Sequence, residues 1–389
     1  MNRRMKIAIL WNCLTGYLNA CLKELVGRDG VELFVCHNAG LLDSPFDDRQ
    51  FAWIKNRLAW RSFGDLQQLE GRLEAFDPDV IVFSGWLVPS YRRVARRFAN
   101  RAWRVMTMDN CWLGNVRQRL GVVIGRAYVR PLADAVWVPG ERQAILARKL
   151  GFEQHTILRG LYSCDQPVFL AARRSQETDE RPLPRSFLFV GRFVPEKGLT
   201  TLVKAYMSYR KATTDPWPLV CCGAGPLRSQ LEGKEGIIIK GFVQPSRLPA
   251  VLASAGCLVL ASTFEPWAVV VHEAASAGLP ILASEKVGAA VHLVQPNYNG
   301  FIFGNGDEAG LAASMKRISD MKSARREEMS QASLQLSRQF SPGLWADVLL
   351  ESYSALAKDL SLDTFATSDT SIQRGYVPVD GDLSVGETT

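Results

Sequence analysis

The stretch "FLFVGRFVPEKGLTTLVKAY", residues 187–206, carries the pattern that decides the fold. Its apolar run ends at Val190, Gly191 opens a loop, and a helical pattern begins near Leu199. A short apolar run followed directly by a helix is the repeating unit of a parallel sheet with crossover helices. Because similar units recur along the chain, the sequence predicts an α/β fold.

Two groups of such units are predicted, with a polar, proline-rich connection at residues 161–186 between them. We expect two Rossmann-like, doubly wound domains at residues 1–170 and 171–340. An amphipathic pattern at 342–358 predicts a last helix, within a segment 341–360. Residues 361–389 lack periodicity and are expected to be disordered. Strands are predicted at 6–10, 31–36, 80–85, 104–109 and 135–140, and at 186–192, 217–223, 236–242, 256–262, 280–285 and 300–304.

Length and composition set the class of protein. A chain of 389 residues that is 47% hydrophobic and 22% charged fits two domains of roughly 150–200 residues. No apolar run reaches the ~18 residues of a membrane-spanning helix. The basic, then apolar start is interpreted as a first strand rather than a signal sequence, because Asn12, Thr15 and Asn19 interrupt the apolar run. Eight cysteines without a CxxC pair predict reduced, mostly buried thiols, no zinc site and a cytoplasmic location.

Positive charge is concentrated between Arg92 and Arg130, where ten arginines face Asp109 alone. One interpretation is a solvated surface helix. Another is a surface for anionic lipid or for a phosphorylated acceptor, which would place the protein peripherally at the inner face of the membrane. No helix-turn-helix, zinc-finger or RNA-binding signature accompanies the charge, so nucleic acid is not an expected partner.

Two cations follow the strand of the opening stretch. Arg192 and Lys197 lie in the loop at the carboxyl end of the predicted strand, where parallel α/β sheets bind ligands. The helix that follows offers backbone N–H groups to an anion. Two fixed cations beside a diphosphate would stabilise the charge that develops when it leaves. The alternative is an ordinary loop with surface charges.

Two glutamates stand eight positions apart in "FEPWAVVVHEAASAGLP", residues 264–280. Pro266 suits the first turn of a helix and Gly278 suits its end. Eight residues of helix rise about 12 Å, which exceeds the roughly 5–9.5 Å of a paired-carboxylate hydrolase. Glu265 and Glu273 could instead bind different hydroxyls of one long ligand, such as a ribose and a sugar. Solvated helix charges are the alternative.

Two glycine-containing turns complete the pattern. Gly223 and Gly225 follow a predicted strand and resemble half of a dinucleotide-binding fingerprint, although simple turn geometry would also require them. The loop at 241–243, which includes Phe242 and Val243, could offer backbone groups to a nucleobase.

In this order the segments resemble the second domain of the family 4 glycosyltransferases, which have the GT-B fold. The resemblance is dense over residues 185–310 and thinner at the hinge, where Gly160, Asp165 and Phe169 match. It implies two domains facing a central cleft and a last helix that crosses back to the first domain. The matching elements are Gly191-Arg192, Glu196-Lys197-Gly198, residues 223–227, residues 241–243, Glu265-Pro266 and Glu273-Ala274.

The resemblance also implies roles. Glu273 would hold ribose hydroxyls and Glu265 the hydroxyls of the donor sugar, while Arg192 and Lys197 would bind the diphosphate and stabilise it as leaving group. We expect metal-independent, retaining transfer from a UDP- or GDP-sugar to a saccharide or lipid-linked acceptor, in bacterial polysaccharide or glycoconjugate synthesis, with no permanently bound cofactor. A 2-epimerase-like enzyme or a non-catalytic nucleotide-sugar binder remains open. Further donor contacts are expected at Gly191, Gly223, Gly225, Phe242, Val243, Pro266, Trp267, Ala268 and Val269.

The chain departs from the family pattern at several positions. Ala268 replaces a glycine after Glu265 and Pro266, and Gly16 alone remains of a glycine-rich loop after the first strand. The histidine often found after the fourth strand of the first domain is missing. Asp109 or Asn110 could make a sugar or acceptor contact there, or Asp109 could cap a turn.

Overall fold

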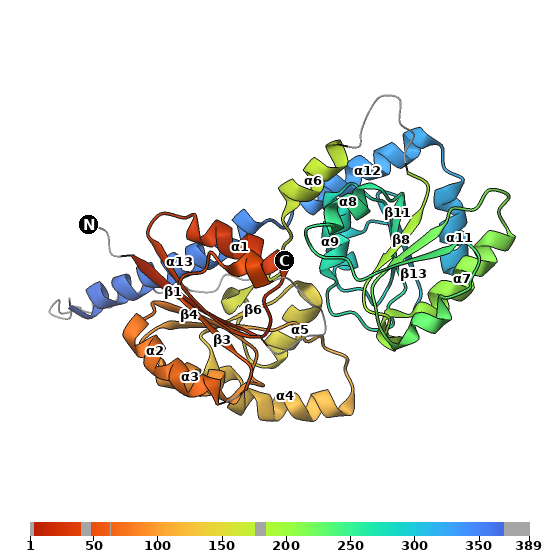
Figure 1. Cartoon of the computed structure of the whole chain (residues 1–389). Helices are drawn as coiled ribbons and strands as arrows, with labels where there is room; N and C mark the ends of the chain where they lie inside the picture. The colour runs from red at the N-terminus through yellow and green to blue at the C-terminus, as the bar shows by residue number, and fades with distance from the viewer. Residues whose placement is uncertain (1–3, 40–47, 63, 176–183, 369–389) are drawn as a thin grey trace, which may run out of the picture. The chain divides into compact units, whose positions relative to one another are not determined.

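The computed structural model describes residues 4–39, 48–62, 64–175 and 184–368. In this part of the chain, helices cover both faces of two parallel sheets (Figure 1). Both sheets belong to one compact unit, Met1–Val348. The α/β, doubly wound architecture predicted from the sequence is confirmed.

The first sheet has the order β3-β2-β1-β4-β5-β6-β7 in the described residues, and its pairs are parallel. The strand order changes direction between β1 and β4, so the loops after these strands diverge and leave a crevice. The strands are β1 (Met5–Trp11), β2 (Val31–Asn38), β3 (Arg57–Trp60), β4 (Val80–Ser84), β5 (Trp103–Thr107), β6 (Ala135–Trp137) and β7 (Ile157–Leu158).

The second sheet has the order β10-β9-β8-β11-β12-β13 in the described residues and is also parallel. Its order reverses between β8 and β11, so loops from the two sides meet at the carboxyl ends of these two strands. The strands are β8 (Phe187–Val190), β9 (Leu219–Cys222), β10 (Ile237–Gly241), β11 (Cys257–Leu260), β12 (Ile281–Ser284) and β13 (Gly300–Phe303).

Helices connect the strands, as the alternating pattern predicts. Those that matter most for the site are α7, which follows β8, and α9, which follows β11. The α-helices are α1 (Gly16–Val26), α2 (Leu69–Phe76), α3 (Pro89–Arg97), α4 (Val116–Tyr128), α5 (Glu141–Lys149), α6 (Gln166–Arg174), α7 (Leu199–Lys211), α8 (Leu248–Ala253), α9 (Val269–Ser276), α10 (Ala290–Leu293), α11 (Glu308–Ser319), α12 (Ser323–Ser337) and α13 (Pro342–Ser368).

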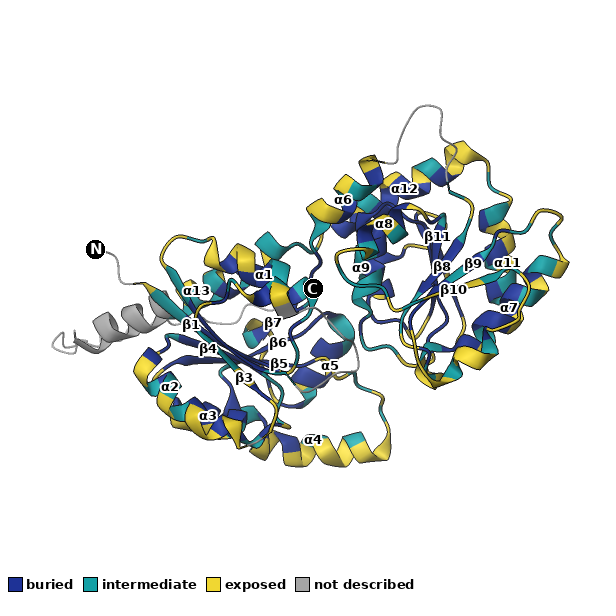
Figure 2. Ribbon diagram, in the orientation of Figure 1, coloured by how far each residue is buried: buried dark blue, intermediate teal, exposed yellow. Residues whose placement is uncertain are grey.

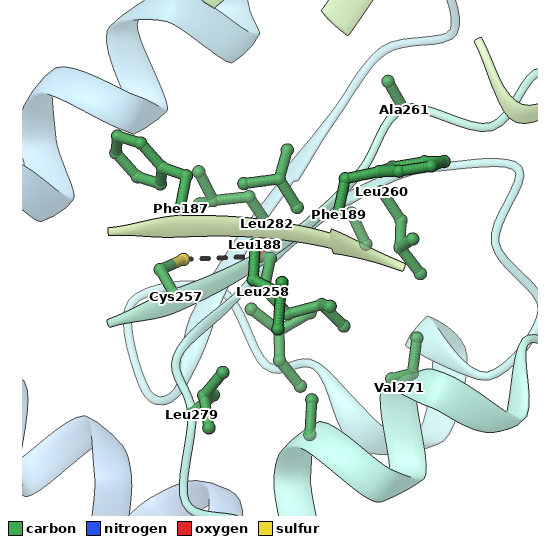
Figure 3. Close-up of a cluster of buried hydrophobic side chains, with 14 of the residues drawn as sticks. Phe187, Leu188, Phe189, Cys257, Leu258, Leu260, Ala261, Val271, Leu279 and Leu282 are labelled. Atoms are coloured by element: carbon green, nitrogen blue, oxygen red, sulfur yellow. Dashed lines mark hydrogen bonds between the residues drawn. The ribbon is translucent and has the colours of Figure 1, made fainter. Parts of the chain in front are cut away.

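The central strands are buried along most of their length (Figure 2). Strands covered by helices on both faces consist of continuous apolar residues rather than an alternating pattern. In Figure 3, Phe187 and Phe189 of β8 and Leu258 of β11 lie in one cluster with Val271 of α9 and Leu279. Each large apolar side chain buried in this way stabilises the fold by roughly 1.5–3 kcal/mol.

The structure corrects the predicted elements in three places. The sequence missed β3 and β7, which are short strands at the edges of the first sheet. The predicted connection contains α6, and the predicted boundary between residues 170 and 171 falls inside that helix. The prediction of disorder is wrong for residues 361–368, because α13 continues to Ser368. The remainder of the predicted tail, residues 369–389, lies outside the described residues.

The arginines around α3 do not form the unpaired basic surface that counting along the chain indicates. Carboxylates from other segments pair with four of them. The pairs are Arg93–Glu70 (3.1 Å), Arg97–Glu74 (2.6 Å), Arg101–Glu74 (2.7 Å) and Arg104–Asp134 (2.6 Å).

The first turns of α13 are fixed to the first sheet by Trp345. Its indole stacks on Trp137 of β6 with ring centroids 4.6 Å apart, and its Nε1 donates a hydrogen bond to the Leu161 carbonyl at 2.9 Å. Both indoles are buried. This contact attaches the start of the last helix to an inner strand next to the edge of the first sheet.

Trp345→Ala should therefore lower the free energy of unfolding by about 3–5 kcal/mol, because a buried aromatic ring leaves a cavity. Urea denaturation measures the loss. Leu344→Ala is the control, since the Leu344 side chain next to it is exposed and should change stability by less than about 0.5 kcal/mol. Equal effects of the two changes would contradict the role of the stacked pair.

Candidate active site

A cavity of about 570 Å³ opens at the carboxyl ends of β8, β9 and β10. One part of its wall is formed by the residues that directly follow each of these strands. Gly191 follows β8, Gly223 follows β9, and Phe242 follows β10. The cavity therefore lies beside the switch in strand order, where open α/β sheets bind ligands.

Lys197 and Glu265 form an ion pair at one side of this cavity. Lys197 comes from the loop after β8 and Glu265 from the loop after β11, so the pair spans the switch point. Ser262 Oγ also donates to the Glu265 carboxylate at 3.4 Å. The side chains of Lys197 and Glu265 are only 20% and 11% exposed. A half-buried pair of this kind can exchange its internal contact for charged or hydroxyl groups of a ligand.

Two glycines allow the loops to approach this closely. Gly198 has φ +65°, and a Cβ there would lie 1.9 Å from the carbonyl oxygen of Ala261. A Cβ on Gly223 would lie 1.9 Å from the carbonyl oxygen of Gly191. Any side chain would push the loops apart, so glycine at these positions is a requirement of the site geometry.

Arg192 adds a second cation to the cavity wall. It is exposed, whereas Lys197 is half-buried. Helix α7 begins at Leu199, two residues after Lys197. Its N-terminus adds the positive end of a helix dipole to the two cations. The wall that follows β8 is therefore suited to an anion.

Helix α9 begins later than the sequence indicates. Pro266 was predicted in its first turn, but the helix starts at Val269, and Pro266 precedes it in a loop that lines the cavity. The residue before the helix, Ala268, has φ +77° and ψ 85°. This is the position where the family resemblance predicts glycine. The left-handed backbone is kept with alanine, at a cost of roughly 1–2 kcal/mol.

Glu273 lies one turn inside α9, on the same face as Val269 and Val270, which line the cavity. It is half-buried and does not itself line the cavity. No side-chain hydrogen bond to Glu273 occurs within the described residues. Burial raises the pKa of the Glu273 carboxyl to about 7. The Glu273 carboxyl thus has no hydrogen-bond donor in the described part of the chain and lies one helical turn from the cavity lining, so a ligand could donate hydrogen bonds to it.

His272, the neighbour of Glu273, anchors α9 on its buried side. The backbone N–H of Cys164 donates to His272 Nδ1 at 3.2 Å, so Nε2 carries the proton and donates to the Ser337 carbonyl at 3.0 Å. Burial lowers the pKa of His272 to about 4. The imidazole is therefore neutral near pH 7 and acts as a structural bridge that positions Glu273.

Two tyrosines that the sequence did not single out also line the cavity. Tyr162 donates a hydrogen bond to Asp109 Oδ2 at 3.2 Å, and the rings of Tyr17 and Tyr162 meet edge to face at 5.3 Å. Burial raises the pKa of both phenols, so they remain protonated donors. Tyr17 is next to Gly16, which the sequence predicts as a possible contact, so its place could have been inferred. Tyr162 lies in the predicted connection between the domains, where no motif indicates a site residue.

Gln143 of α5 supports the loop that carries Glu265. Its Nε2 donates to the Pro266 carbonyl at 2.6 Å, and it also contacts Cys111 Sγ at 3.2 Å. Gln143 is buried. Nothing in the sequence around Gln143 marks it as part of the site, because it lies 123 residues from its partner.

Most of the residues predicted for the site come together in this cavity, and four do not line it. Gly16, Asn110, Gly225 and Glu273 lie outside the lining, although Glu273 is close by on α9. Within the described residues, no group of three or more His, Cys, Asp or Glu side chains could hold a metal ion. The predicted residues that line the cavity are Asp109, Gly191, Arg192, Lys197, Gly223, Phe242, Val243, Glu265, Pro266, Trp267, Ala268 and Val269.

The fold is the GT-B fold: two Rossmann-like domains with the cavity at the strand ends. Among solved structures, HepE of Anabaena in complex with UDP is similar, with a TM-score of 0.67, 16% identity, and coverage of 90% of this chain and 100% of that one. The family model "Glycosyl transferases group 1" matches residues 172–335, which include Arg192, Lys197 and both glutamates.

Curated relatives are also glycosyltransferases. An uncharacterised glycosyltransferase of Methanocaldococcus jannaschii is 30% identical over 123 residues, which is 30% of this chain and 31% of that protein. The lipopolysaccharide core biosynthesis glycosyltransferase LpsD of Rhizobium meliloti is 25% identical over 288 residues, 72% of this chain and 76% of that protein. The first of these matches thus spans about a third of the relative's length.

The raised pKa of Glu273 predicts a pH-dependent stability difference. Between the ordinary carboxyl pKa near 4.5 and the folded value of about 7, the unfolded chain releases a proton that the folded chain keeps. The wild-type protein therefore loses stability as pH rises through this window. Glu273→Gln should be more stable than the wild type by about 1–3 kcal/mol at about pH 8. This gain should disappear near pH 4.5. Urea denaturation of both proteins across this range measures it, and a constant difference would mean that the carboxyl is solvated.

Proposed function

We propose that this chain is a retaining glycosyltransferase that moves a sugar from a nucleoside-diphosphate sugar to a saccharide or lipid-linked acceptor. The observation that carries the proposal is the Lys197–Glu265 pair at the switch point of the second sheet, beside Arg192 in one cavity. A cation and a carboxylate next to each other match the junction of a nucleotide sugar, where a diphosphate meets a hydroxyl-rich ring.

The diphosphate would lie against Arg192, Lys197 and the start of α7. Its negative charge grows as the bond to the sugar breaks, so cations fixed before the reaction stabilise the transition state more than the bound donor. This positive charge is the basis for proposing transfer without a metal ion and without a permanently bound cofactor. Phosphate binding would draw Lys197 Nζ away from the Glu265 carboxylate.

Glu265, released from Lys197, would accept hydrogen bonds from hydroxyls of the donor sugar. Glu273 would bind the ribose. Two ribose hydroxyls would donate hydrogen bonds to its carboxylate, which has no such partner among the described residues of the ligand-free protein. The backbone at Phe242 and Val243 would contact a uracil or guanine base. Asp109, oriented by Tyr162, would contact the sugar or the acceptor from the first domain. Retention of configuration is proposed on the resemblance of the Glu265–Glu273 element to that of retaining enzymes.

The acceptor is proposed to be a saccharide or a lipid-linked sugar of a bacterial polysaccharide or glycoconjugate, handled in the cytoplasm. The relative named for lipopolysaccharide core biosynthesis supports this class, because it aligns with 72% of the chain. Transfer from a panel of UDP- and GDP-sugars, with and without EDTA, tests the function. Products should keep the anomeric configuration of the donor, and EDTA should not reduce turnover.

Lys197→Ala and Arg192→Ala should each lower the transfer rate more than they weaken donor binding. One fixed electrostatic contact to a leaving group contributes roughly 2–4 kcal/mol, so each change should slow turnover by about 30- to 1000-fold. Single-turnover kinetics and donor titration separate the two effects. Lys204→Ala is the matched control, since it removes a cation from α7 that pairs with Glu308 outside the cavity. Near-normal turnover in both cavity variants would contradict the assignment.

Glu265→Gln and Glu273→Gln should impair sugar transfer in different ways. Ribose contacts are the same in the ground state and the transition state, so Glu273→Gln should raise the KM for the donor and spare kcat. Glu265 lies next to the transferred sugar, where charge and geometry change, so Glu265→Gln should lower kcat. Donor-saturation kinetics, with circular dichroism to check the fold, make the comparison. Identical changes in KM and kcat would show that Glu265 and Glu273 do not contact different parts of one donor molecule.

A further inference from the structure

Helix α4 presents a row of large apolar side chains to solvent. Each of them is 58–73% exposed, and α4 is coloured mostly as exposed in Figure 2. Single exposed apolar residues are normal, but a continuous row on one helix marks an interaction surface. We call these side chains the α4 stripe: Leu113, which lies three residues before the helix, and Val116, Leu120, Val123 and Ile124 within it.

The α4 stripe points away from the protein. Val116, Leu120 and Val123 follow the i, i+4, i+7 spacing of one helix face. Gln118, Val122 and Gly125 follow the same spacing two residues later, about 200° around the helix. This second set is the inner face: Gly125 is buried, and Val122 packs against the core of the first domain. The helix is attached by a narrow inner face, and its apolar side has no covering in the described residues.

Three arginines flank the α4 stripe. By helical position, Arg117 lies along one edge and Arg119 and Arg126 along the other. Arg119 and Arg126 donate to backbone carbonyls, at 3.1 and 2.9 Å. None of the three forms an ion pair within the described residues, and α4 contains no acidic residue. The arginines near α3, by contrast, are mostly paired with carboxylates.

Two more cations lie next to α4. Arg92 and Arg96 of α3 stand over the ring of Tyr128, with their guanidinium carbons 5.8 and 5.6 Å from its centroid. They too form no ion pair with a described carboxylate. The positive charge left unpaired on this side of the first domain is therefore gathered around an exposed apolar stripe.

We infer that α4 is an interfacial helix that inserts the α4 stripe into the surface of an anionic lipid bilayer. An apolar stripe between cations fits the boundary between acyl chains and negatively charged headgroups. A protein partner or a second copy would have to supply carboxylates around a flat apolar strip, whereas an anionic bilayer supplies both chemistries. The inference concerns a surface and not the sugar chemistry, so it can fail independently of the proposed function.

Flotation of the full chain with vesicles tests the inference. The wild type should bind vesicles of phosphatidylcholine and phosphatidylglycerol more tightly than vesicles of phosphatidylcholine alone. Val123→Glu and Leu120→Glu should each lower this binding by tenfold or more, because a charge would enter the acyl region. Val168→Glu is the matched control: it makes the same change at an exposed position of α6 and should leave binding unchanged.

A second comparison separates this surface from the arginines around α3. Replacing Arg117, Arg119 and Arg126 with Gln should lower binding to anionic vesicles about fivefold for each arginine. Replacing the paired Arg93, Arg97 and Arg101 removes the same charge and should have a much smaller effect. Circular dichroism and transfer activity on a soluble acceptor confirm that the variants fold.

Three outcomes would overturn the inference. The first is wild-type binding that does not depend on anionic lipid. The second is undiminished vesicle binding by Val123→Glu and Leu120→Glu. The third is a dimer of the wild type, seen by analytical ultracentrifugation without lipid and abolished by Val123→Glu. This last result would assign the α4 stripe to a second copy of the chain.

Discussion

The ion pair between Lys197 and Glu265 is the contact around which the site is arranged. It exists because β8 and β11 are neighbours in the second sheet although they are far apart in the sequence, with Cys257 opposite Phe187 in register. Two partly buried charges are costly unless they are paired. In the ligand-free protein each charge offsets part of the desolvation cost of the other, and a ligand that separates them has to replace both contacts, with an anion for Lys197 and hydroxyls for Glu265. This requirement selects for a ligand that combines the two chemistries.

The parts of the site that could be predicted are those encoded within one strand–loop–helix unit. Arg192, Lys197 and Glu265 each lie in the segment between an apolar strand and the next helix, so their place at the carboxyl edge follows from local pattern alone. Tyr162 and Gln143 could not be found in this way, because they reach the cavity through contacts between distant segments. The edge strands β3 and β7 were missed for a different reason: at four and two residues they are too short to show a periodic pattern.

The location of unpaired charge is likewise difficult to predict from the sequence. A count along the chain sees ten arginines between residues 92 and 130 and one carboxylate, but folding brings Glu70, Glu74 and Asp134 to four of them. Among these arginines, the ones that pair with no described carboxylate lie on or beside α4. Counting along the chain thus marks a basic region but not which of its arginines stay unpaired, because pairing across elements, and not local density, decides where net charge remains.

Residues 109–116 connect the cavity to the helix that carries the α4 stripe. Asp109 lines the cavity, and α4 starts at Val116, capped by Asn115, whose side chain accepts from the Gln118 N–H at 2.9 Å. Gln118 in turn accepts from the Leu113 N–H at 2.6 Å and donates to the Cys111 carbonyl at 2.8 Å. These bonds connect the start of α4 to the segment that follows Asp109. If α4 lies in a lipid surface, this connection would keep Asp109 and the part of the cavity that it lines close to that surface, where a lipid-anchored acceptor could approach a bound donor.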